Sequence, residues 1–548
     1  MEEERLVRLQ REFDALGGVC CGAADPYEVA VPAEDGVPLR TVVTLPDAAG
    51  PFPTILMRSC YPQAEAEYRL TAREYARRGF GFVYQFCRGT GGSGGVWEPN
   101  VNERRDGLVT ARWLAAQPFA GRCGYLGCSY LAFTGWVMAD ALPDCFATLY
   151  LTHYGTDRFA SAYQEGMFRQ DILTGWAMQN AGFPVTADYL ESCRYRPQIE
   201  VDEALWGGRL DWYRDWITHT DPDDPYWNEG LWGALRQVPG KLNLPVYIGS
   251  GWYDHHLGGT VRGYEALSPA AAAHSVLRIG AWNHWFENVI PGKPAEHLEN
   301  SDTASALRWF TEILKEGRLP RGGVQLYNIG ADRWETLDRM PAGDLPGRQL
   351  FLDGAARALT PAQPQHAQPL QYRYDPDRPV PSHGGESLFT SKEEIGSLPQ
   401  PEPDWRPDVV SFVSDPLTEP LALRGEIRVR LQVASDCADT AFTAKLLEVA
   451  PDGVARNIRG GITSLGYRCG APHRLDYRPS ERAEIEIRMW PISWTLAPGC
   501  RLRLDLSSSN FPEYAAHPNC AGGWALARAE RVATQTIFGG SVLLPVAE

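Results

Sequence analysis

Short apolar runs alternate with helical segments through the first third of the chain. Residues 53–58 and 80–86 are apolar runs that suit strands buried on both faces of a sheet. Helical spacing follows each of them, at 67–78 and at 102–117. This strand–helix rhythm predicts a parallel sheet with helices on both faces. In such sheets the functional groups gather at the carboxyl ends of the strands.

The rhythm continues on both sides of a long interruption. Residues 27–45 alternate in polarity around Glu34-Asp35-Gly36 and predict a β-hairpin ahead of the first buried strand. We expect further strands and helices in the same sheet: strands at 124–127, 148–151, 244–249 and 275–280, and helices at 130–141, 257–267 and 303–315.

The most informative turn in this rhythm is Gly124-Tyr-Leu-Gly-Cys-Ser129-Tyr-Leu-Ala132. Gly127 and Ser129 lie on a tight strand-to-helix turn, which projects a serine hydroxyl group and backbone N–H groups above the end of a sheet. The usual pattern is Gly-x-Ser-x-Gly, whereas Leu131 stands here in the last position, followed by the small Ala132. Because many serines before helices are only N-caps, the motif needs partners elsewhere in the chain.

Two other expected strand ends carry the partners that a serine nucleophile requires. Asp254 and His284 each follow a short apolar strand, and the chain order Ser, Asp, His is that of the α/β-hydrolases. A serine hydroxyl group needs an imidazole to take its proton and a buried carboxylate to orient that imidazole. Alone, Asp254 could cap a helix and His284 could lie on the surface. Three matching positions at strand ends favour a catalytic triad.

The remainder of the chain divides into two further parts. Residues 154–240 are rich in Trp and Tyr, show helical patches without a strand run, and predict a helical cap insertion that walls the site. The catalytic domain then comprises 1–153 and 241–320. Residues 321–548 predict an all-β sandwich: 345–405 is Pro-rich and irregular, and short alternating strands follow at 426–433, 483–488, 501–506 and 540–544.

Charge and cysteine usage narrow the classes of partner. The net charge of −16 argues against a nucleic-acid or anionic-membrane surface, because both need basic patches. No run approaches the roughly 18 apolar residues of a membrane span, and the charged N-terminus lacks signal-peptide regions. The 12 scattered cysteines fit reduced thiols in a cytoplasmic protein. A homodimer is compatible with these properties.

No metal or organic cofactor is expected. The cysteines and histidines show no zinc-ligand spacing. The glycine-rich loop 88–95 follows a strand as phosphate-binding loops do, but it has neither Gly-x-Gly-x-x-Gly nor the Gly-Lys-Ser/Thr ending of a P-loop. We interpret it as a structural loop.

The chain is similar to the cocaine esterase and X-prolyl dipeptidyl aminopeptidase family of α/β-hydrolases. The resemblance rests on motifs along nearly the whole chain: Arg58-Ser-Cys-Tyr61, Gly127-Cys-Ser129-Tyr130-Leu-Ala, Gly251-Trp-Tyr-Asp254, Gly280-Ala-Trp-Asn-His284 and Leu504-Asp-Leu-Ser-Ser-Ser-Asn510-Phe-Pro. It implies an α/β-hydrolase core, a helical cap and a C-terminal jelly roll.

The resemblance also implies roles for single residues. Ser129 would be the nucleophile, His284 the base and Asp254 its orienter, while the backbone N–H group of Tyr130 and the hydroxyl group of Tyr61 would form the oxyanion hole. An uncharged phenol can donate a hydrogen bond to a developing oxyanion. The residues expected around the substrate are Gln85, Phe86, Tyr154, Phe159, Trp176, Trp252 and Trp285.

Several positions depart from the family pattern. Ala132 replaces a glycine, Cys60 a proline before the oxyanion tyrosine, and Ala281 the proline of Gly-Pro-Trp. Phe86 replaces the acidic residue of an Asp-x-Arg-Gly loop and removes a charge near Arg88. The substrate therefore cannot be carried over from the family.

The preferred function is a serine hydrolase that cleaves an ester or amide of a small organic substrate through an acyl-enzyme. An X-Pro dipeptidyl peptidase and an α-amino acid ester or β-lactam acylase are alternatives, and both need acidic side chains for a substrate ammonium group. Asp157, Glu165 and Asp171 are the candidates. An acyltransferase or cyclase could use the same triad, since exclusion of water separates transfer from hydrolysis. A non-catalytic binding protein is the least favoured alternative.

Overall fold

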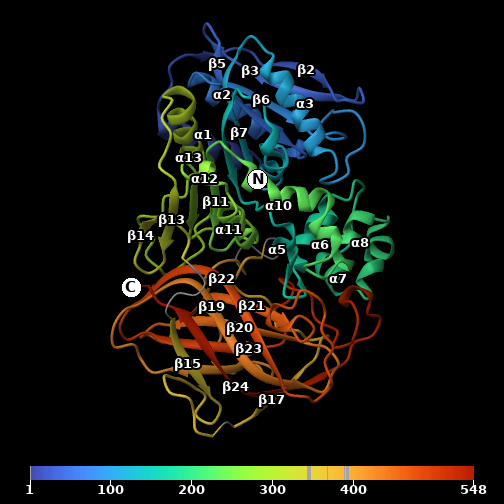
Figure 1. Cartoon of the computed structure of the whole chain (residues 1–548), viewed down its shortest axis with the longest axis vertical. Helices are drawn as coiled ribbons and strands as arrows, with labels where there is room; N and C mark the ends of the chain where they lie inside the picture. Colours follow the sequence, from blue (N-terminus) through green and yellow to red (C-terminus); the bar gives the residue numbers. More distant parts are fainter. Residues whose placement is uncertain (1, 342–346, 367, 388, 390–393, 548) are drawn as a thin grey trace.

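Two large β-sheets and a group of helices make up the molecule (Figure 1). The computed structural model describes residues 2–341, 347–366, 368–387, 389 and 394–547. The first sheet is formed by the amino-terminal part of the chain and the second by the carboxyl-terminal part, and the helices of 154–240 lie beside the first sheet and against the second. The first sheet, the inserted helices and the second sheet are called here the sheet domain, the cap and the β domain.

The sheet domain contains ten strands in the order β14-β13-β12-β11-β8-β7-β5-β6-β3-β2. The strands from β6 to β13 run parallel, whereas β2, β3 and β14 join the sheet antiparallel. The bounds are β2 Tyr27–Pro32, β3 Pro38–Thr44, β5 Phe52–Ser59, β6 Gly81–Phe86, β7 Ala120–Cys128, β8 Phe146–Thr152, β11 Val246–Gly251, β12 Val276–Gly280, β13 Gly323–Asn328 and β14 Arg333–Leu337. The short strands β1 Gly22–Ala23 and β4 Pro46–Asp47 pair with each other.

Helices cover both faces of this sheet. Successive side chains of a strand point to opposite faces, and in β5 both directions are buried. Ile55 packs in a cluster with Phe13 and Phe310, while Leu56, the next residue, packs in the cluster that contains Phe133. The helices are α1 Glu2–Leu16, α2 Glu65–Arg77, α3 Glu103–Ala115, α4 Tyr130–Trp136, α11 Leu257–Glu265, α12 Pro269–Ala272 and α13 Asp302–Phe310. The doubly covered sheet agrees with the alternation of the sequence.

The sheet continues further along the chain than we expected. β13 pairs with β12 in parallel, from Val276 opposite Gly323 onward, and β14 returns antiparallel to β13. Val324 and Leu326 are fully buried there. The sheet domain therefore extends past residue 320, where we expected the β domain to begin.

The cap is mainly helical but not wholly so. Its helices are α5 Arg158–Ala162, α6 Gln170–Gln179, α7 Tyr189–Arg194, α8 Asp211–Thr218, α9 Pro225–Asn228 and α10 Gly230–Lys241. Between α5 and α6 lies a small hairpin of β9 Tyr163–Gln164 and β10 Met167–Phe168. Two-residue strands leave no alternation to read in a sequence, so the expectation of a cap without strands was wrong here.

The β domain forms one strongly curved sheet in the order β21-β20-β23-β18-β16-β15-β24-β19-β22, with β17 paired to β24. The bounds are β15 Gly347–Asp353, β16 Ala358–Thr360, β17 Leu370–Tyr374, β18 Val410–Ser414, β19 Leu421–Ser435, β20 Ala441–Val449, β21 Ala455–Ser464, β22 Ala483–Leu496, β23 Arg501–Ser507 and β24 Ala533–Pro545. The end strands β21 and β22 lie against each other, so the sheet nearly closes. Three of these strands, β15 to β17, occupy the Pro-rich stretch that we expected to be irregular.

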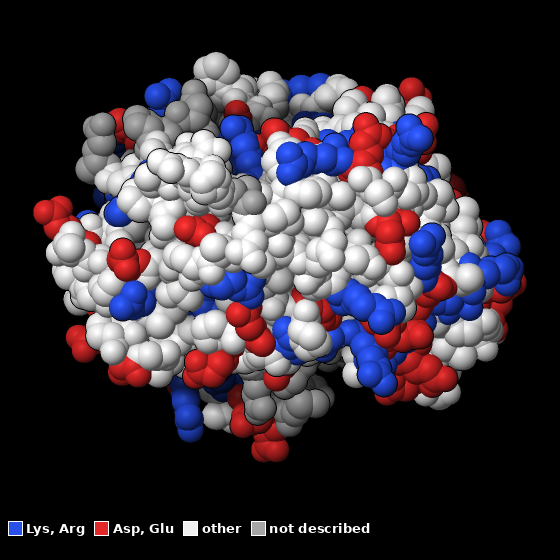
Figure 2. All heavy atoms as spheres, turned by 90° about the horizontal axis from the view of Figure 1, so that it is seen from below, with Lys and Arg blue, Asp and Glu red and all other residues white. Residues whose placement is uncertain are grey.

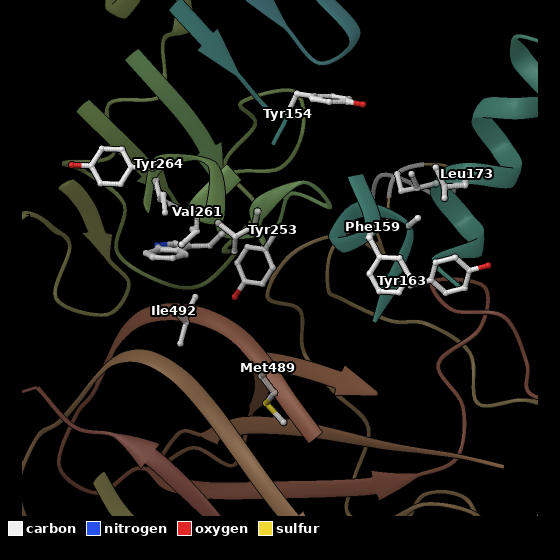
Figure 3. Close-up of a cluster of buried hydrophobic side chains, with 14 of the residues drawn as sticks. Tyr154, Phe159, Tyr163, Leu173, Tyr253, Val261, Tyr264, Met489 and Ile492 are labelled. Carbon is white, nitrogen blue, oxygen red and sulfur yellow. The ribbon is translucent and has the colours of Figure 1, made fainter. Parts of the chain in front are cut away.

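The three parts share a continuous apolar core. Figure 3 shows Tyr253 and Val261 of the sheet domain facing Ile492 and Met489 of β22, with Phe159 of the cap to one side. Two backbone hydrogen bonds also cross the boundary. The N–H group of Ile329 donates to the carbonyl of Ser493 at 3.0 Å, and the N–H group of Thr495 donates to the carbonyl of Ile329 at 2.8 Å. The β domain is therefore packed against the loops of the sheet domain.

Charges of both signs are interspersed on the surface of the β domain. Figure 2 shows this face, on which Lys and Arg side chains alternate with Asp and Glu side chains. Across the described part of the chain, no helix combines the length and the apolar character needed to cross a membrane.

Candidate active site

Ser129 lies on the sharp turn between β7 and α4. Its φ of 58° and ψ of −128° are unusual for a residue with a side chain, and such strain persists only where the surroundings impose it. The N–H group of Ser129 donates to the carbonyl of Thr152 at 2.9 Å, which ties the turn to the end of β8. Gly127 is required here, because a Cβ atom at this position would lie 2.2 Å from the carbonyl oxygen of Leu131.

Asp254 and His284 meet Ser129 above the carboxyl ends of neighbouring strands. The Nε2 atom of His284 lies 2.9 Å from the Oγ atom of Ser129, and its Nδ1 atom lies 2.5 Å from the Oδ2 atom of Asp254. β11 ends at Gly251 and β12 at Gly280, so each side chain follows its strand by a few residues. The structure thus brings the three residues together in the order and at the places that the sequence predicts.

Asp254 is held as an anion although it is fully buried. Burial by itself would raise its pKa, but the imidazole of His284, which is hydrogen-bonded to the carboxylate, holds the pKa well below its ordinary value. The backbone N–H group of His256 also donates to Oδ1 of Asp254 at 2.7 Å. An ionised carboxylate in this position fixes the imidazole of His284 with Nδ1 protonated and Nε2 directed at the serine.

His153 closes the site behind Asp254. Its Nε2 atom lies 4.0 Å from Oδ2 of Asp254, and its ring packs edge-on against Phe286, with centroids 4.3 Å apart. Burial lowers the pKa of His153 to about 4, so this imidazole is neutral near pH 7. It therefore borders the carboxylate without competing with His284 as a cation.

The hydroxyl group of Tyr61 faces the cap. It accepts a hydrogen bond of 3.1 Å from Nε1 of Trp176. Burial raises the pKa of Tyr61 well above its ordinary value, so the phenol keeps its proton and can donate it to another acceptor. The ring packs edge-on against Tyr130, with centroids 6.3 Å apart.

The side chain of Tyr130 is held by hydrogen bonds to its hydroxyl group and by stacking of its ring. Its hydroxyl group donates to Oε1 of Glu103 at 2.6 Å and accepts from the backbone N–H group of Asn100 at 2.8 Å. Its ring stacks on Trp176, with an angle of 15° between the planes. As the first residue of α4, Tyr130 has a backbone N–H group with no carbonyl partner in its own helix. That N–H group is available to an oxyanion next to Ser129.

A narrow cavity of about 50 Å³ opens onto Ser129 and His284. Of the seven residues expected around the substrate, Tyr154 and Trp176 line this cavity. A larger cavity of about 340 Å³ lies in the β domain, but it contains none of the three residues Ser129, Asp254 and His284. We therefore locate the active site by the presence of Ser129 and His284, and not by the volume of the cavity.

The other five expected pocket residues do not line this cavity. Gln85 is buried between the side chains of Arg58, Thr41 and Thr110, and Phe86 packs against aromatic rings on the opposite face of β6. Trp252 donates its indole N–H group to the carbonyl of Tyr327 at 2.8 Å. Phe159 stacks on Tyr163 in the cap, and Trp285 follows His284 with its ring 6.1 Å away. The ring of Trp285 thus packs edge-on against His284. The other four side chains serve packing or hydrogen bonding elsewhere.

Sequence reasoning missed several residues that line the cavity. His255 and His256 follow Asp254 directly, and burial lowers the pKa of both well below the ordinary value. Arg158, Asn100 and Trp216 line it as well. The doubled histidine next to Asp254 was a visible signal, whereas nothing in the sequence distinguishes Arg158 from the other arginines.

Asp254, His255 and His284 also lie close enough for a metal ion, since one potential ligand atom from each falls within 4.8 Å of the others. However, the Nδ1 atom of His284 is hydrogen-bonded to Oδ2 of Asp254. The Nε2 atom of His284 is directed at Ser129. The arrangement matches a hydrogen-bonded triad better than a set of ligands that converge on one point.

Two domain families match the chain over most of its length. Residues 35–285 match the X-Pro dipeptidyl-peptidase (S15 family), and residues 319–528 match the X-Pro dipeptidyl-peptidase C-terminal non-catalytic domain. The chain belongs to the X-Pro dipeptidyl-peptidase (S15) family. It is a serine hydrolase with an α/β-hydrolase core and an all-β C-terminal domain.

Relatives of this S15 hydrolase cover nearly all of it. Cocaine esterase from Rhodococcus sp. (strain MB1 Bresler) is 28% identical over 552 residues, which cover 92% of this chain and 94% of the esterase. An α-amino acid ester hydrolase of known structure superposes with a TM-score of 0.83 at 23% identity, over 97% and 98% of the two chains. An aminopeptidase from the marine sediment archaeon Thaumarchaeota archaeon gives a TM-score of 0.80 at 21% identity, over 96% of each. These structures share the fold.

The acidic residues proposed for a substrate ammonium group lie away from the cavity of this S15 hydrolase. Asp157 pairs with Arg236 and Arg262, which hold its pKa below the ordinary value in spite of burial. Asp171 accepts hydrogen bonds from a tyrosine hydroxyl group and a backbone N–H group. Glu165 packs toward the β domain, where burial raises its pKa to about 8. None of the three is among the residues that line the cavity.

Proposed function

We propose that this chain hydrolyses esters or amides of small organic acids through an acyl-enzyme on Ser129. The observation that carries the proposal is the continuous chain of hydrogen bonds from Ser129 through His284 to Asp254, at 2.9 and 2.5 Å. It starts from a serine in strained backbone geometry and ends at a buried carboxylate whose pKa is held low. These are the elements of serine nucleophile activation.

The proposed reaction has two halves. In the first, His284 takes the proton of Ser129 as Oγ attacks the substrate carbonyl, and then gives that proton to the leaving group. Asp254 stabilises the imidazolium that forms between these steps. In the second half, His284 takes a proton from a water molecule that attacks the acyl-serine ester, and returns that proton to Oγ of Ser129 as the ester bond breaks and the acid is released. The N–H group of Tyr130 and the hydroxyl group of Tyr61 would bind the oxyanion in both halves.

A fluorophosphonate probe tests the nucleophile. We expect a single covalent adduct on Ser129, found by mass spectrometry of the wild-type protein, and no adduct in Ser129→Ala. Ser161→Ala is the matched control, since the hydroxyl group of Ser161 also bonds to a histidine, 2.9 Å from Nδ1 of His256, but lies on a helix of the cap. A folded wild-type protein that is not labelled at Ser129 would overturn the proposal.

Esters rank ahead of X-Pro peptides as substrates. An X-Pro dipeptidyl peptidase or an α-amino acid ester hydrolase needs an acidic site for the substrate ammonium group, and the cavity is lined by no Asp or Glu among the described residues. A 4-nitrophenyl ester and Gly-Pro-4-nitroanilide, compared side by side, decide the ranking. A higher kcat/KM for the second compound would reverse it.

The cysteines support a reducing location. All 12 carry free thiols, including the exposed Cys20 and Cys469. Proteins exported to oxidising compartments commonly pair such thiols in disulfides. This supports our proposal that the protein works in the cytoplasm.

A further inference from the structure

Arg158 is a buried cation in the wall of the active-site cavity. It is the first residue of α5 in the cap, only 7% of its surface is exposed, and it lines the same cavity as Ser129 and His284. Its guanidinium group lies over the ring of Trp216, 4.6 Å from the centroid, and at 5.6 Å from that of Trp232. The two indoles hold the group at the cavity by packing and cation–π contact.

No carboxylate pairs with this cation among the described residues. Every Asp and Glu oxygen there lies more than 4.0 Å from the guanidinium nitrogens of Arg158. The adjacent Asp157 points to Arg236 and Arg262 instead. The Nε atom of Arg158 has no hydrogen-bond acceptor. The buried hydroxyl group of Tyr154, which lines the cavity beside it, interacts with the guanidinium group but donates to no acceptor. A buried charge without a counter-ion is unfavourable unless something else supplies one.

The rest of the cavity wall does not neutralise Arg158. Its other lining residues include no acidic side chain, and burial lowers the pKa of His255 and His256 well below the ordinary value, which keeps these two imidazoles neutral. Two carboxylates that contact residues of the cavity wall are already engaged, Asp254 with His284 and Glu103 with Tyr130. The remaining surface is apolar and is supplied by Ile172, Leu173 and Trp176.

We propose that the substrate of this enzyme carries a carboxylate, which binds to Arg158 and the hydroxyl group of Tyr154 while its ester or amide carbonyl lies at Ser129. This rests on the proposed serine hydrolysis and names its substrate class. A guanidinium group matches a carboxylate with paired N–H donors, and such charge-assisted bonds are strong where water is excluded. The site selects against an ammonium group, which Arg158 would repel.

Two series of esters test the charge preference in the wild-type enzyme. The first places the charge in the acyl chain: 4-nitrophenyl hemiglutarate, its methyl ester and 4-nitrophenyl 5-aminopentanoate. The second places it in the leaving group: 4-acetoxybenzoate, its methyl ester and O-acetyltyramine. We expect kcat/KM to be at least about tenfold higher for the anionic ester than for the neutral one in one of the series, and lowest for the cationic ester. A preference for the neutral or cationic ester in both series overturns the proposal.

Variants of Arg158 assign the preference to this residue. Arg158→Met should lower kcat/KM for the anionic ester about 10- to 100-fold more than for its neutral partner, and Arg158→Lys should retain part of the preference. An equal loss for all esters of a series would show that Arg158 only supports the packing of the cap and would overturn the proposal. The comparison in the wild-type enzyme stands even if a variant fails to fold.

Fluorophosphonate labelling separates this proposal from the one on which it rests. If Ser129 is labelled but the wild-type enzyme ignores substrate charge, the carboxylate site is wrong and the serine chemistry stands. If Ser129 is not labelled, the serine chemistry itself is wrong.

Discussion

Arg459 of the β domain donates a hydrogen bond of 2.5 Å to the carbonyl oxygen of Trp252, two residues before Asp254. The same guanidinium group pairs with Glu386 and donates to the carbonyl of Pro491 at 2.9 Å. On its other side, the backbone N–H group of Trp252 donates to the carbonyl of Gly280 at 2.8 Å. The loop that carries Asp254 is thus held between β12 and a buried ion pair of the β domain, so that domain helps to position the active site.

Replacing Arg459 should therefore affect both stability and turnover. Arg459→Met leaves Glu386 buried without its cation and the carbonyl of Trp252 without its donor, and we expect a loss of about 3–5 kcal/mol in the free energy of unfolding. Turnover should fall as well, because the loop before Asp254 loses a support. Denaturant unfolding, and kcat measured at a temperature where both proteins are folded, check these two effects.

A surface ion pair of the same domain supplies the control for Arg459. The side chain of Arg430 is 57% exposed and pairs with Glu486. Arg430→Met should change stability by less than about 1 kcal/mol and leave kcat unchanged. Equal unfolding midpoints for Arg459→Met and Arg430→Met would show that the buried pair does not support the loop.

Tyr61→Phe should retain the fold and lose most of the turnover. The substitution removes only the hydroxyl group, and loss of one oxyanion donor typically costs about 10²- to 10³-fold in kcat. Trp176→Phe is the control: it removes the N–H group that donates to Tyr61 at 3.1 Å but leaves the phenol as a donor. We expect a loss below about tenfold in that control. An unchanged kcat in Tyr61→Phe would remove Tyr61 from the oxyanion hole.

The positions of the triad could be predicted because they depend on topology alone. Parallel strands end at one edge of the sheet, so Ser129, Asp254 and His284 had to come near one another once the strands were recognised. Which side chains surround the substrate depends instead on the direction in which each side chain points and on the partner with which it pairs. Arg158 and Asp157 are adjacent opposite charges, and only the fold shows that Asp157 pairs with other arginines and Arg158 does not.

The point along the chain where the first sheet ends was mispredicted for a similar reason. β13 is only six residues long, and such a short local pattern does not tell which of two sheets a strand will join. Pairing with β12 decides it, and that pairing is a tertiary contact. Gln85 and Phe86 were likewise expected around the substrate, where Phe86 replaces an acidic residue of the family pattern, but the structure buries both side chains away from the cavity.

His153 should make stability depend on pH in the acidic range. Burial lowers its pKa to about 4, below the value of about 6.5 that it has in an unfolded chain. As the pH falls, the unfolded state binds the proton first, so the contribution of the neutral imidazole is present above pH 6.5 and is lost between about pH 6.5 and 4. Between pH 7.5 and 5 this amounts to about 2 kcal/mol.

The variant His153→Asn isolates that contribution. Asparagine tolerates the backbone φ of 54° at this position and has no proton to gain. The unfolding free energy of the wild-type protein should fall by about 2 kcal/mol more than that of His153→Asn between pH 7.5 and 5, measured with urea. The exposed His366→Asn is the control and should follow the wild-type protein. Parallel pH profiles for wild type and His153→Asn would contradict the assignment.

Gly127→Ala should disable the serine while most of the fold survives. The added Cβ atom would lie 2.2 Å from the carbonyl oxygen and 2.5 Å from the carbonyl carbon of Leu131. Because both are backbone atoms, the first turn of α4 has to move, and Ser129 moves with it. A displacement of about 1 Å at a reacting group can cost about 10²-fold in rate, so we expect a loss of that size in kcat and in the rate of fluorophosphonate labelling.

Gly240→Ala is the matched control, since its Cβ atom would come no closer than 3.6 Å to the carbonyl of Ala266. A folded Gly127→Ala protein that is labelled at the wild-type rate would show that the turn can take a side chain, and that Gly127 does not set the position of Ser129.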